Sequence, residues 1–512
     1  MNNALKYLIL TASILLCLPS VCADTSPKRE MRAVWIATVY RIDWPSAAGT
    51  DRTAAETQKR DMRRMLDRLK AAGFNAVSFQ VRSMCDALYK SSLEPWSASL
   101  TGERGKAPAE GWDPLAYCVE QAHSRGMECH AWINPFRFAV TKELPSTPSD
   151  MKIRKAGMLL SYTDKKGKKT TVLDPGNPNA RQHVVSVCRE IVENYDIDGI
   201  MFDDYFYPDR IPLGRGYDYD RWKASGTKLS QADWRRANVN LAIAEVYDMI
   251  QLTKPYVRFG VSPAGVGGGN GAASSRYSLP PCYNGNDWMY DRIYCDPLAW
   301  LEAGSVDYIS PQIYWTRDNA TNPYEPIARW WSEVADRFGC HFYASHSISS
   351  LAKTDNHQAW EERGAQIDIN RANTLNSAPG SIFYSARYIT SDAAKGFGQH
   401  LAKNQFRHPA IPPAIDWKDT ADPGEIHGLI HKDGHLTWDP MDNMRFIVYA
   451  IPQSVTMSQA LSDTDEGYRA EYIMGITYIP TFTIPADRRK GYRYVVAPLD
   501  RYGNEWAPVS IK

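Results

Sequence analysis

The sequence predicts an α/β protein, a (β/α)8 TIM barrel followed by a small all-β sandwich domain. From residue 31 to about residue 405, strand-like and helix-like segments alternate eight times, the pattern typical of a TIM barrel. After residue 408 the helical periodicity stops, and short strand-like runs follow. A doubly wound open sheet would rarely contain eight such regular units, so we favour the barrel.

Eight short segments rich in β-branched and aromatic residues are the predicted barrel strands. They lie at residues 32–39, 75–81, 128–136, 197–206, 257–265, 306–315, 340–348 and 380–389. The clearest helical pattern between them spans residues 53–73 and ends at Gly73. Its apolar stripe consists of Met62, Met65, Leu66 and Leu69.

A second domain is predicted at the C-terminal end. Residues 406–420 are proline-rich and form a predicted linker between a barrel at 29–405 and a β-sandwich at 421–512. The runs around Trp438 and Tyr494 resemble a fibronectin type III domain, in which Trp438 would be the core tryptophan and Tyr494 the corner tyrosine. These are structural roles, so the chemistry is expected in the barrel.

Composition excludes some function classes. The 512-residue chain has 59 basic and 58 acidic residues, which argues against a nucleic-acid binder with a broad basic surface. Sixteen Trp and 29 Tyr residues suit the binding of sugars or peptides, although large cores also use them. We expect a saccharide partner, no nucleic acid and no transmembrane span.

The first 23 residues match a secretory signal peptide cut after Ala23. Lipid attachment at Cys22 is a less favoured alternative, and either case predicts an extracytoplasmic protein, in the periplasm or at the cell surface. Removal of this segment leaves seven cysteines, of which Cys282 and Cys295 bracket one loop and are candidates for a disulfide. No CxxC or HExxH spacing occurs, so we expect neither a metal nor a cofactor.

The most informative segment is the fourth predicted strand, which ends in Asp203 and Asp204. Because side chains alternate along a strand, Ile200 and Phe202 suit the helix-facing side, and Asp203 would point into the barrel mouth. Both carboxylates are candidate catalytic groups, since TIM-barrel active sites lie at the C-terminal ends of the strands. The competing interpretation is a structural one, a salt bridge to Arg82 or a loop cap.

Other strand ends carry polar or aromatic side chains where a substrate would lie. The predicted substrate-binding residues are Gln80, Arg82, Asn134, Arg137, Tyr205, Tyr207, Gln312, Tyr314, Trp315 and His346. Long loops at about 137–179, 208–230 and 265–296 are expected to build an open cleft around them. Their polar and aromatic composition suits an extended polar ligand.

Five segments of the barrel resemble the glycosyl-hydrolase-10-like family in sequence and order. They are REMRAVWIATV, AGFNAVSFQVR, HAWINPFR, DIDGIMFDDYFYP and SPQIYW. The resemblance covers about residues 29–405 and implies an extracytoplasmic TIM-barrel glycoside hydrolase. That family includes bacterial enzymes that cleave peptidoglycan glycan strands stripped of their peptides. It also implies that the cleft is lined by Asp203 and Asp204, with Arg82, Asn134, Arg137, Tyr205, Gln312 and Tyr314.

Two more distant resemblances bear on the mechanism. The DGIMFD segment is similar to the fourth strand of α-amylase-like barrels, where the position of Asp203 holds the nucleophile. It also resembles the family-18 chitinase strand, but Tyr205 stands where the chitinase has its acid Glu. The nucleophile Glu that family 10 xylanases carry at strand seven is absent from residues 340–348, so we do not predict xylanase activity.

The second catalytic group stays open at this stage. Glycoside hydrolysis normally uses two carboxyl groups, and the second would come from a rim loop or from the substrate itself. The rim candidates are Asp43, Asp86, Glu94 and Asp318. In the other mechanism an N-acetyl sugar supplies its own nucleophile, with Gln312 and Tyr314 as acetamido partners.

We therefore expect hydrolysis of an N-acetylhexosamine polymer, most specifically peptidoglycan-derived glycan strands. The alternatives are a glycosidase for a dietary, host or capsular polysaccharide, and a non-catalytic carbohydrate-binding protein of the cell envelope.

Overall fold

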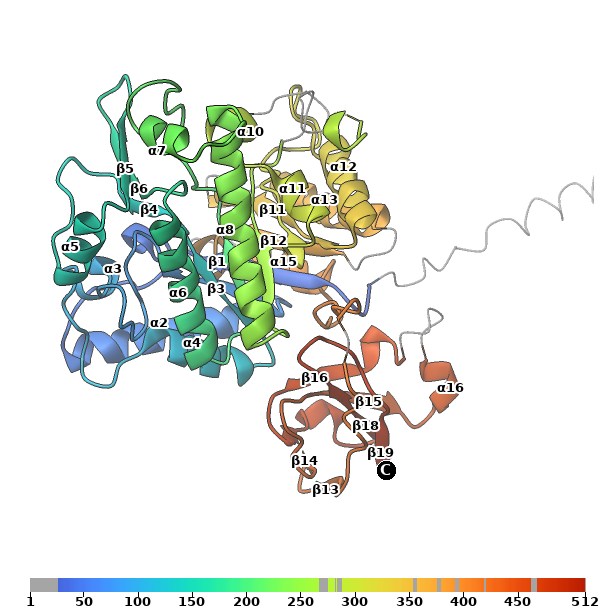
Figure 1. Cartoon of the computed structure of the whole chain (residues 1–512). Coiled ribbons are helices and arrows are strands. Elements are labelled where there is room, and N and C mark those ends of the chain that lie inside the picture. Colours follow the sequence, from blue (N-terminus) through green and yellow to red (C-terminus); the bar gives the residue numbers. More distant parts are fainter. Residues whose placement is uncertain are drawn as a thin grey trace, which may run out of the picture.

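Parallel strands form the wall of a barrel in the computed structural model (Figure 1). The structure describes residues 26–266, 275–280, 282, 288–352, 357–374, 379–391, 396–418, 420–461 and 467–511. The predicted signal peptide at 1–23 therefore lies outside the described residues. The strands are β1 (Met31–Ile36), β2 (Ala76–Arg82), β3 (Glu128–Ile133), β7 (Gly199–Phe202), β8 (Arg258–Val261), β9 (Tyr308–Ile309), β10 (His341–Phe342), β11 (Ala344–Ser347) and β12 (Gly380–Tyr384).

Strand pairing closes the barrel. The sheet order is β10-β9-β8-β7-β3-β2-β1-β12-β11, and only Tyr343 separates β10 from β11. These two are one strand, since β10 pairs with β9 through His341 and Tyr308, whereas β11 pairs with β12 through Ala344 and Ser381. The predicted eight-stranded α/β barrel is thus confirmed.

Helices surround the sheet and bury their apolar sides against it. They are α2 (Arg52–Ala71), α4 (Pro114–His123), α6 (Pro178–Asn194), α8 (Gln231–Thr253), α11 (Pro297–Glu302), α12 (Tyr324–Phe338), α13 (His357–Asn373), α14 (Arg387–Thr390) and α15 (Phe397–Lys403). In α2 the predicted stripe is buried, the Asp51 side chain accepts from the Ala54 amide at the N-terminus, and Gly73 follows with a φ of 91°. The cap and the stripe together fix where this helix starts and which side faces inward.

Glycines on neighbouring strands make room for the large rings that fill the lumen. A Cβ atom at Gly260 would lie 2.1 Å from the Tyr308 ring, and one at Gly380 would lie 2.1 Å from the Tyr343 ring. Both tyrosines belong to the lumen cluster together with Trp35. The interior is therefore a packed core up to the level of the mouth, the end of the barrel where the strands terminate.

The loops at the mouth contain secondary structure that we did not predict. Residues 137–179 hold the antiparallel strands β4 (Arg137–Ala139), β5 (Leu159–Thr163) and β6 (Lys169–Leu173), with helix α5 (Pro148–Lys155) between the first two. Short helices add to the other loops, namely η1 (Val39–Arg41), α3 (Ala98–Thr101), α7 (Tyr219–Ala224), α10 (Trp288–Arg292) and η2 (Ser349–Ala352). Figure 1 shows the β4–β6 sheet and α7 at the opposite end from the C-terminal domain.

Two small antiparallel sheets form the C-terminal domain and confirm the all-β sandwich. One sheet contains β13 (Ile430–Lys432), β14 (His435–Thr437) and β17 (Thr481–Thr483), and the other contains β16 (Ile473–Thr477), β15 (Arg445–Pro452), β18 (Tyr492–Leu499) and β19 (Val509–Ile511). Trp438 is buried between them, and the Tyr494 hydroxyl donates to the Arg488 carbonyl oxygen at 2.9 Å. The closer similarity to fibronectin type III stays a prediction, as do the exact domain limits.

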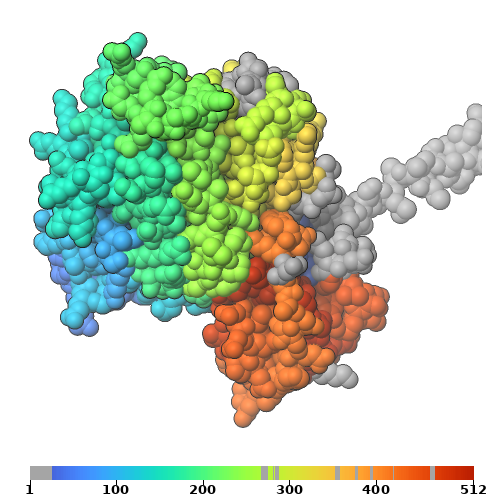
Figure 2. Space-filling model, viewed as in Figure 1, coloured from blue at the N-terminus to red at the C-terminus, as the bar shows by residue number. Residues whose placement is uncertain are grey.

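The sandwich is joined to the base of the barrel, the end where the strands begin (Figure 2). Arg445 of β15 donates to Glu128 of β3 at 2.7 Å, and Arg501 contacts Asp198 at 3.1 Å, all four side chains being buried. The proline-rich stretch is also packed, since Ile411 exchanges backbone hydrogen bonds with residues 28–30. Paired charges of this kind hold the two domains in one orientation.

Candidate active site

Asp203 projects into the barrel mouth directly after β7. Met201 belongs to the lumen cluster, whereas Ile200 and Phe202 pack outward against the helices. Because side chains alternate along a strand, the next inward position after Met201 is Asp203. The orientation predicted from the sequence is the one observed.

Strand β3 supplies the contacts that hold this carboxyl group. Asp203 Oδ2 accepts hydrogen bonds from Trp132 Nε1 at 3.0 Å and from Asn134 Nδ2 at 3.4 Å. Asp203 Oδ1 is buried and has no well-aligned hydrogen-bond donor among the described residues. A buried acceptor without a donor is costly, so this oxygen is suited to receive a hydrogen bond from a bound ligand.

Burial shifts the protonation of both acids towards neutral pH. It raises the pKa of Asp203 to about 7, an effect that Arg137 and Trp132 oppose and the neighbouring Asp204 strengthens. Burial also raises the pKa of Asp204 to about 6, against hydrogen bonding from Gln312 and the charge of Arg137. Both carboxyl groups can therefore exchange protons near neutral pH, as general acid–base catalysis requires.

Asp204 also faces the mouth, although alternation along the predicted strand would place it on the opposite side from Asp203. The strand ends at Phe202, so the alternation does not extend to Asp204. Gln312 hydrogen bonds to its carboxylate, and the half-buried Tyr314 is close enough that the Asp204 charge contributes to the raised pKa of the phenol. Residues from the ends of β7 and β9 thus meet at one place.

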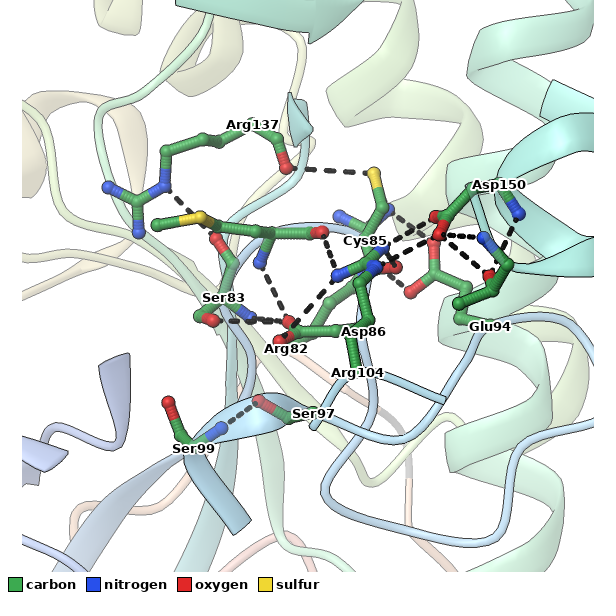
Figure 3. A network of polar contacts seen from close by, with 12 residues as sticks. Arg82, Ser83, Cys85, Asp86, Glu94, Ser97, Ser99, Arg104, Arg137 and Asp150 are labelled. Carbon is green, nitrogen blue, oxygen red and sulfur yellow. Dashed lines mark hydrogen bonds and ion pairs between the residues drawn. The ribbon is translucent and has the colours of Figure 1, made fainter. Parts of the chain in front are cut away.

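Arg137 is a cation whose charge lowers the pKa of both acids. Its guanidinium lies 4.5 Å from the ring centroid of Tyr205, whose side chain is 51% exposed. Its Nε donates to the Ser83 carbonyl oxygen at 3.0 Å (Figure 3), and its backbone N–H donates to Asn134 Oδ1 at 2.9 Å. Arg137 and Tyr205 therefore offer a fixed charge and a flat ring to a ligand in the cleft.

Two predicted substrate contacts on β2 are corrected by the structure. Arg82 is fully buried and pairs with Glu94 through two hydrogen bonds of 2.7 and 2.6 Å, and Figure 3 shows the two side chains in one network. Gln80 is also buried, and its Oε1 accepts from the amides of Thr38 and Val39. Both residues brace loops below the cleft, so neither side chain is available to contact a substrate.

Three further predicted contacts are buried or half-buried in the protein. His346 is buried between Gln366 and Ser381, at 3.0 and 3.1 Å, and burial lowers its pKa to about 3. Tyr207 is buried in the outer core, and Trp315 packs half-buried against that core. Because neither the His346 nor the Tyr207 side chain reaches solvent, these two side chains also do not contact a substrate.

Each rim carboxylate considered as a second catalytic group has a local structural role. Glu94 pairs with Arg82 and His183, which overcome the effect of burial and hold its pKa at about 2. Asp86 accepts from the Ser83 and Met84 amides, and Asp318 is exposed and accepts from Thr316. Glu94 and Asp86 are therefore held in local contacts, and the hydrogen bond to Asp318 comes from a neighbour in its own loop.

Asp43 is the remaining rim acid. Burial raises its pKa to about 6, although it accepts hydrogen bonds from Ala37, Ser385 and Arg387. These contacts join the loop after β1 to the loop after β12. We interpret Asp43 as a brace of the mouth, because both of its oxygens already have donors.

Sequence reasoning missed the aromatic floor under the acid pair. Trp35 and Trp132 meet edge to face with their centroids 4.5 Å apart, and Trp35 Nε1 donates to Ser345 Oγ at 3.3 Å. The signal was present in the sequence, because Trp132 precedes Asn134 by two positions and alternation places both on the same side of β3.

Among the described residues, no group of three or more His, Cys, Asp or Glu side chains is arranged to hold a metal ion.

A family model described as glycosyl hydrolase-like 10 matches residues 30–361, more than half of the chain. The chain belongs to the glycosyl hydrolase-like 10 family. Together with the acid pair in a TIM-barrel mouth, this membership assigns it as a glycoside hydrolase. The predicted family resemblance and enzyme class are confirmed.

Curated relatives of this family member carry consistent names. Glycosyl hydrolase YngK of Bacillus subtilis is 33% identical over 500 residues, which covers 94% of this chain and 93% of the relative. Glycosyl hydrolase DigH of Escherichia coli K12 is 35% identical over 387 residues, which covers 70% of this chain and 84% of the relative. The YngK match therefore includes the C-terminal domain as well as the barrel.

Two solved structures of glycosidases have a partly similar chain path. The PgaB (BpsB) glycoside hydrolase domain from Bordetella bronchiseptica has a TM-score of 0.48 at 14% identity, covering 72% of this chain and 98% of that one. The α-L-fucosidase isoenzyme 2 from Paenibacillus thiaminolyticus has a TM-score of 0.46 at 15% identity, covering 73% of this chain and 49% of that one.

Proposed function

We propose that this glycosyl hydrolase-like 10 protein cleaves an N-acetylhexosamine polymer, and specifically peptidoglycan-derived glycan strands. The observation that supports the proposal best is the unequal pair of acids at the mouth. Asp203 is buried with one oxygen that lacks an aligned donor, and Asp204 is half-buried beside Gln312. An acetamido N–H of the substrate is a suitable donor for the open oxygen of Asp203.

In this proposal the two acids have different roles. Asp204 protonates the leaving glycosidic oxygen, because it is the more accessible acid and its pKa of about 6 keeps part of it protonated near neutral pH. Asp203 orients the acetamido group, whose carbonyl oxygen attacks the anomeric carbon, and water later opens the cyclic intermediate. Substrate-assisted hydrolysis of this kind needs no second enzymic nucleophile.

The other mouth residues fit a sugar polymer. We assign Tyr205 and the Trp132 floor to ring stacking, and Gln312, Tyr314 and Asn134 to hydroxyl and amide groups of the substrate. Arg137 completes the site by contacting an acidic or carbonyl oxygen of the ligand.

We also propose that the protein acts outside the cytoplasm and associates with the cell envelope. The basis is the segment ending at Ala23, and Cys22 offers an alternative lipid anchor. Among the described residues no helix is long and apolar enough to cross a membrane.

A panel of glycans tests the substrate class. Peptide-free peptidoglycan strands, intact peptidoglycan, chitin oligosaccharides and neutral hexose polymers are each incubated with the enzyme, and products are sized by mass spectrometry. We expect products from the peptide-free peptidoglycan strands and from the chitin oligosaccharides, and none from the hexose polymers. Turnover of a hexose polymer alone would refute the N-acetylhexosamine assignment, and Asp204→Asn serves as the inactive blank.

A further inference from the structure

A cavity of about 920 Å³ lies between the barrel base, the proline-rich stretch and the sandwich. The barrel contributes His341 at the start of β10, the proline-rich stretch contributes Asp416 and Trp417, and the sandwich contributes Glu505 and Trp506. His341 and Ser347 are at opposite ends of the β10–β11 strand, so this cavity lies at the other end of the barrel from Asp203. Its volume is near the upper end of the range usual for small-ligand sites.

Two tryptophans of the cavity contact neighbouring side chains and remain partly accessible. Trp417 is 42% exposed, and its ring meets His341 edge to face at a centroid distance of 4.7 Å. Trp506 is half-buried, with its Nε1 donating to Asp500 Oδ2 at 3.1 Å. A large ring exposed in a concave site is typical of ligand recognition, because contact with a ligand removes the ring from water.

The charged groups of the cavity favour a neutral ligand. Asp336, Asp416 and Glu505 supply three carboxylates, while Arg29 is the cation among the described lining residues. Glu505 is held by Lys28 at 2.5 Å and by the Tyr449 hydroxyl at 2.6 Å. Carboxylates accept hydrogen bonds from sugar hydroxyl groups and repel anionic polymers.

We propose that this cavity is a second saccharide-binding site, which takes a short neutral oligosaccharide between the Trp417 and Trp506 rings. It holds a neutral glycan and carries out no chemistry. The site exists only while the two domains are docked, because its walls come from both. This inference does not depend on which glycan the acid pair cleaves.

The test is binding of defined hexasaccharides to the full-length chain by titration calorimetry. The probes are chitohexaose, cellohexaose, mannohexaose and the anionic hexagalacturonate, and Asp204→Asn is present in every protein so that no probe is cleaved. We expect at least one neutral probe to bind, with affinity about tenfold weaker in Trp417→Ala. Trp417→Phe keeps a flat ring and should lose less, and hexagalacturonate should bind more weakly than the neutral probes.

Two variants keep the result interpretable. Leu241→Ala truncates a side chain of α8 that is 44% exposed, close to the exposure of Trp417, and should leave affinity unchanged. Asp416→Asn removes an exposed carboxylate with little change of shape and should weaken binding even if Trp417→Ala folds poorly.

The proposal is overturned if no neutral hexasaccharide binds, or if Trp417→Ala, Trp417→Phe and Asp416→Asn all bind as the parent does. Failure of the proposed substrate class would appear separately, as absent turnover of N-acetylhexosamine polymers, and would not alter the binding result.

Discussion

At the mouth of the barrel, burial raises the pKa of Asp203 to about 7. At the base, Glu128 is also buried, yet Arg258, His130 and Arg445 outweigh burial and hold its pKa at about 2. Asp198, which contacts His123 and Arg501, likewise has a lowered pKa. The difference arises from the partners: the base acids are bonded to cations, whereas the side chains that hydrogen bond to Asp203 are the neutral Trp132 and Asn134. Acids at the base stabilise the domain arrangement, and acids at the mouth remain able to exchange protons.

The largest effect should come from the more exposed mouth acid. Asp204→Asn removes the proposed proton donor and should lower kcat by about 10²- to 10⁴-fold, with little loss of stability. Steady-state hydrolysis of a soluble glycan measures the rate, and urea unfolding measures the stability. Asp318→Asn is the matched control, an exposed rim carboxylate that should leave kcat unchanged. Full activity of Asp204→Asn would assign the acid to another residue.

Removing an acid at the base of the barrel should lower the stability and leave the activity normal. Glu128→Gln leaves Arg445 and Arg258 buried next to a neutral group and should cost about 3–5 kcal/mol of unfolding free energy. The activity per folded molecule should stay normal, because Glu128 is at the far end of the barrel. Glu325→Gln, in the exposed pair with Arg329, is the control that should not shift the urea midpoint. A loss of activity at unchanged stability would contradict the assigned role of the base.

The pH dependence of stability should separate the two ends further. The folded-state pKa of Asp203, about 7, lies above the unfolded value near 3.9, so the folded chain binds more protons between them. Its contribution to stability is therefore present below about pH 4 and is lost as the pH rises to about 7, by up to about 4 kcal/mol. Glu128 has the opposite sign, since its contribution is present above about pH 4 and is lost as the pH falls towards about 2.

Unfolding midpoints measured from pH 3 to pH 8 in wild type, Asp203→Asn and Glu128→Gln test this sign difference. Asp203→Asn should flatten the curve on the neutral side, and Glu128→Gln should flatten it on the acid side. Identical curves for all three proteins would mean that neither carboxyl group has a shifted pKa.

The sequence was sufficient for features that depend on local pattern. The eight strands, helix α2 and the inward side chain of Asp203 all follow from periods of 2 and 3.6 residues. The sequence pattern did not show which polar side chains at the strand ends are already hydrogen bonded to other parts of the fold. Arg82 is bonded to Glu94 from the following loop, and His346 is bonded to Gln366 from helix α13, so both depend on tertiary packing. The strands within 137–179 were missed because they are short and lack a clear apolar alternation.

The smallest expected effect concerns the cation shared by the mouth acids. Arg137 lowers the pKa of both Asp203 and Asp204, so Arg137→Gln should raise both values. If protonated Asp204 is the acid, activity declines as the pH rises through about 6, and this alkaline limb should move to higher pH in the variant. The rate at the optimum should fall by about tenfold, because a substrate contact is also lost.

Arg137→Lys distinguishes the charge from the positioning. Lysine keeps a positive charge near the acids, but it cannot reproduce both the hydrogen bond to the Ser83 carbonyl and the flat contact with Tyr205. The pH–rate profile of Arg137→Lys should therefore keep the wild-type alkaline limb while the rate at the optimum falls. If Arg137→Lys and Arg137→Gln shift the limb equally, the charge of Arg137 does not set the protonation of the pair, and the contrast between mouth and base rests on burial alone.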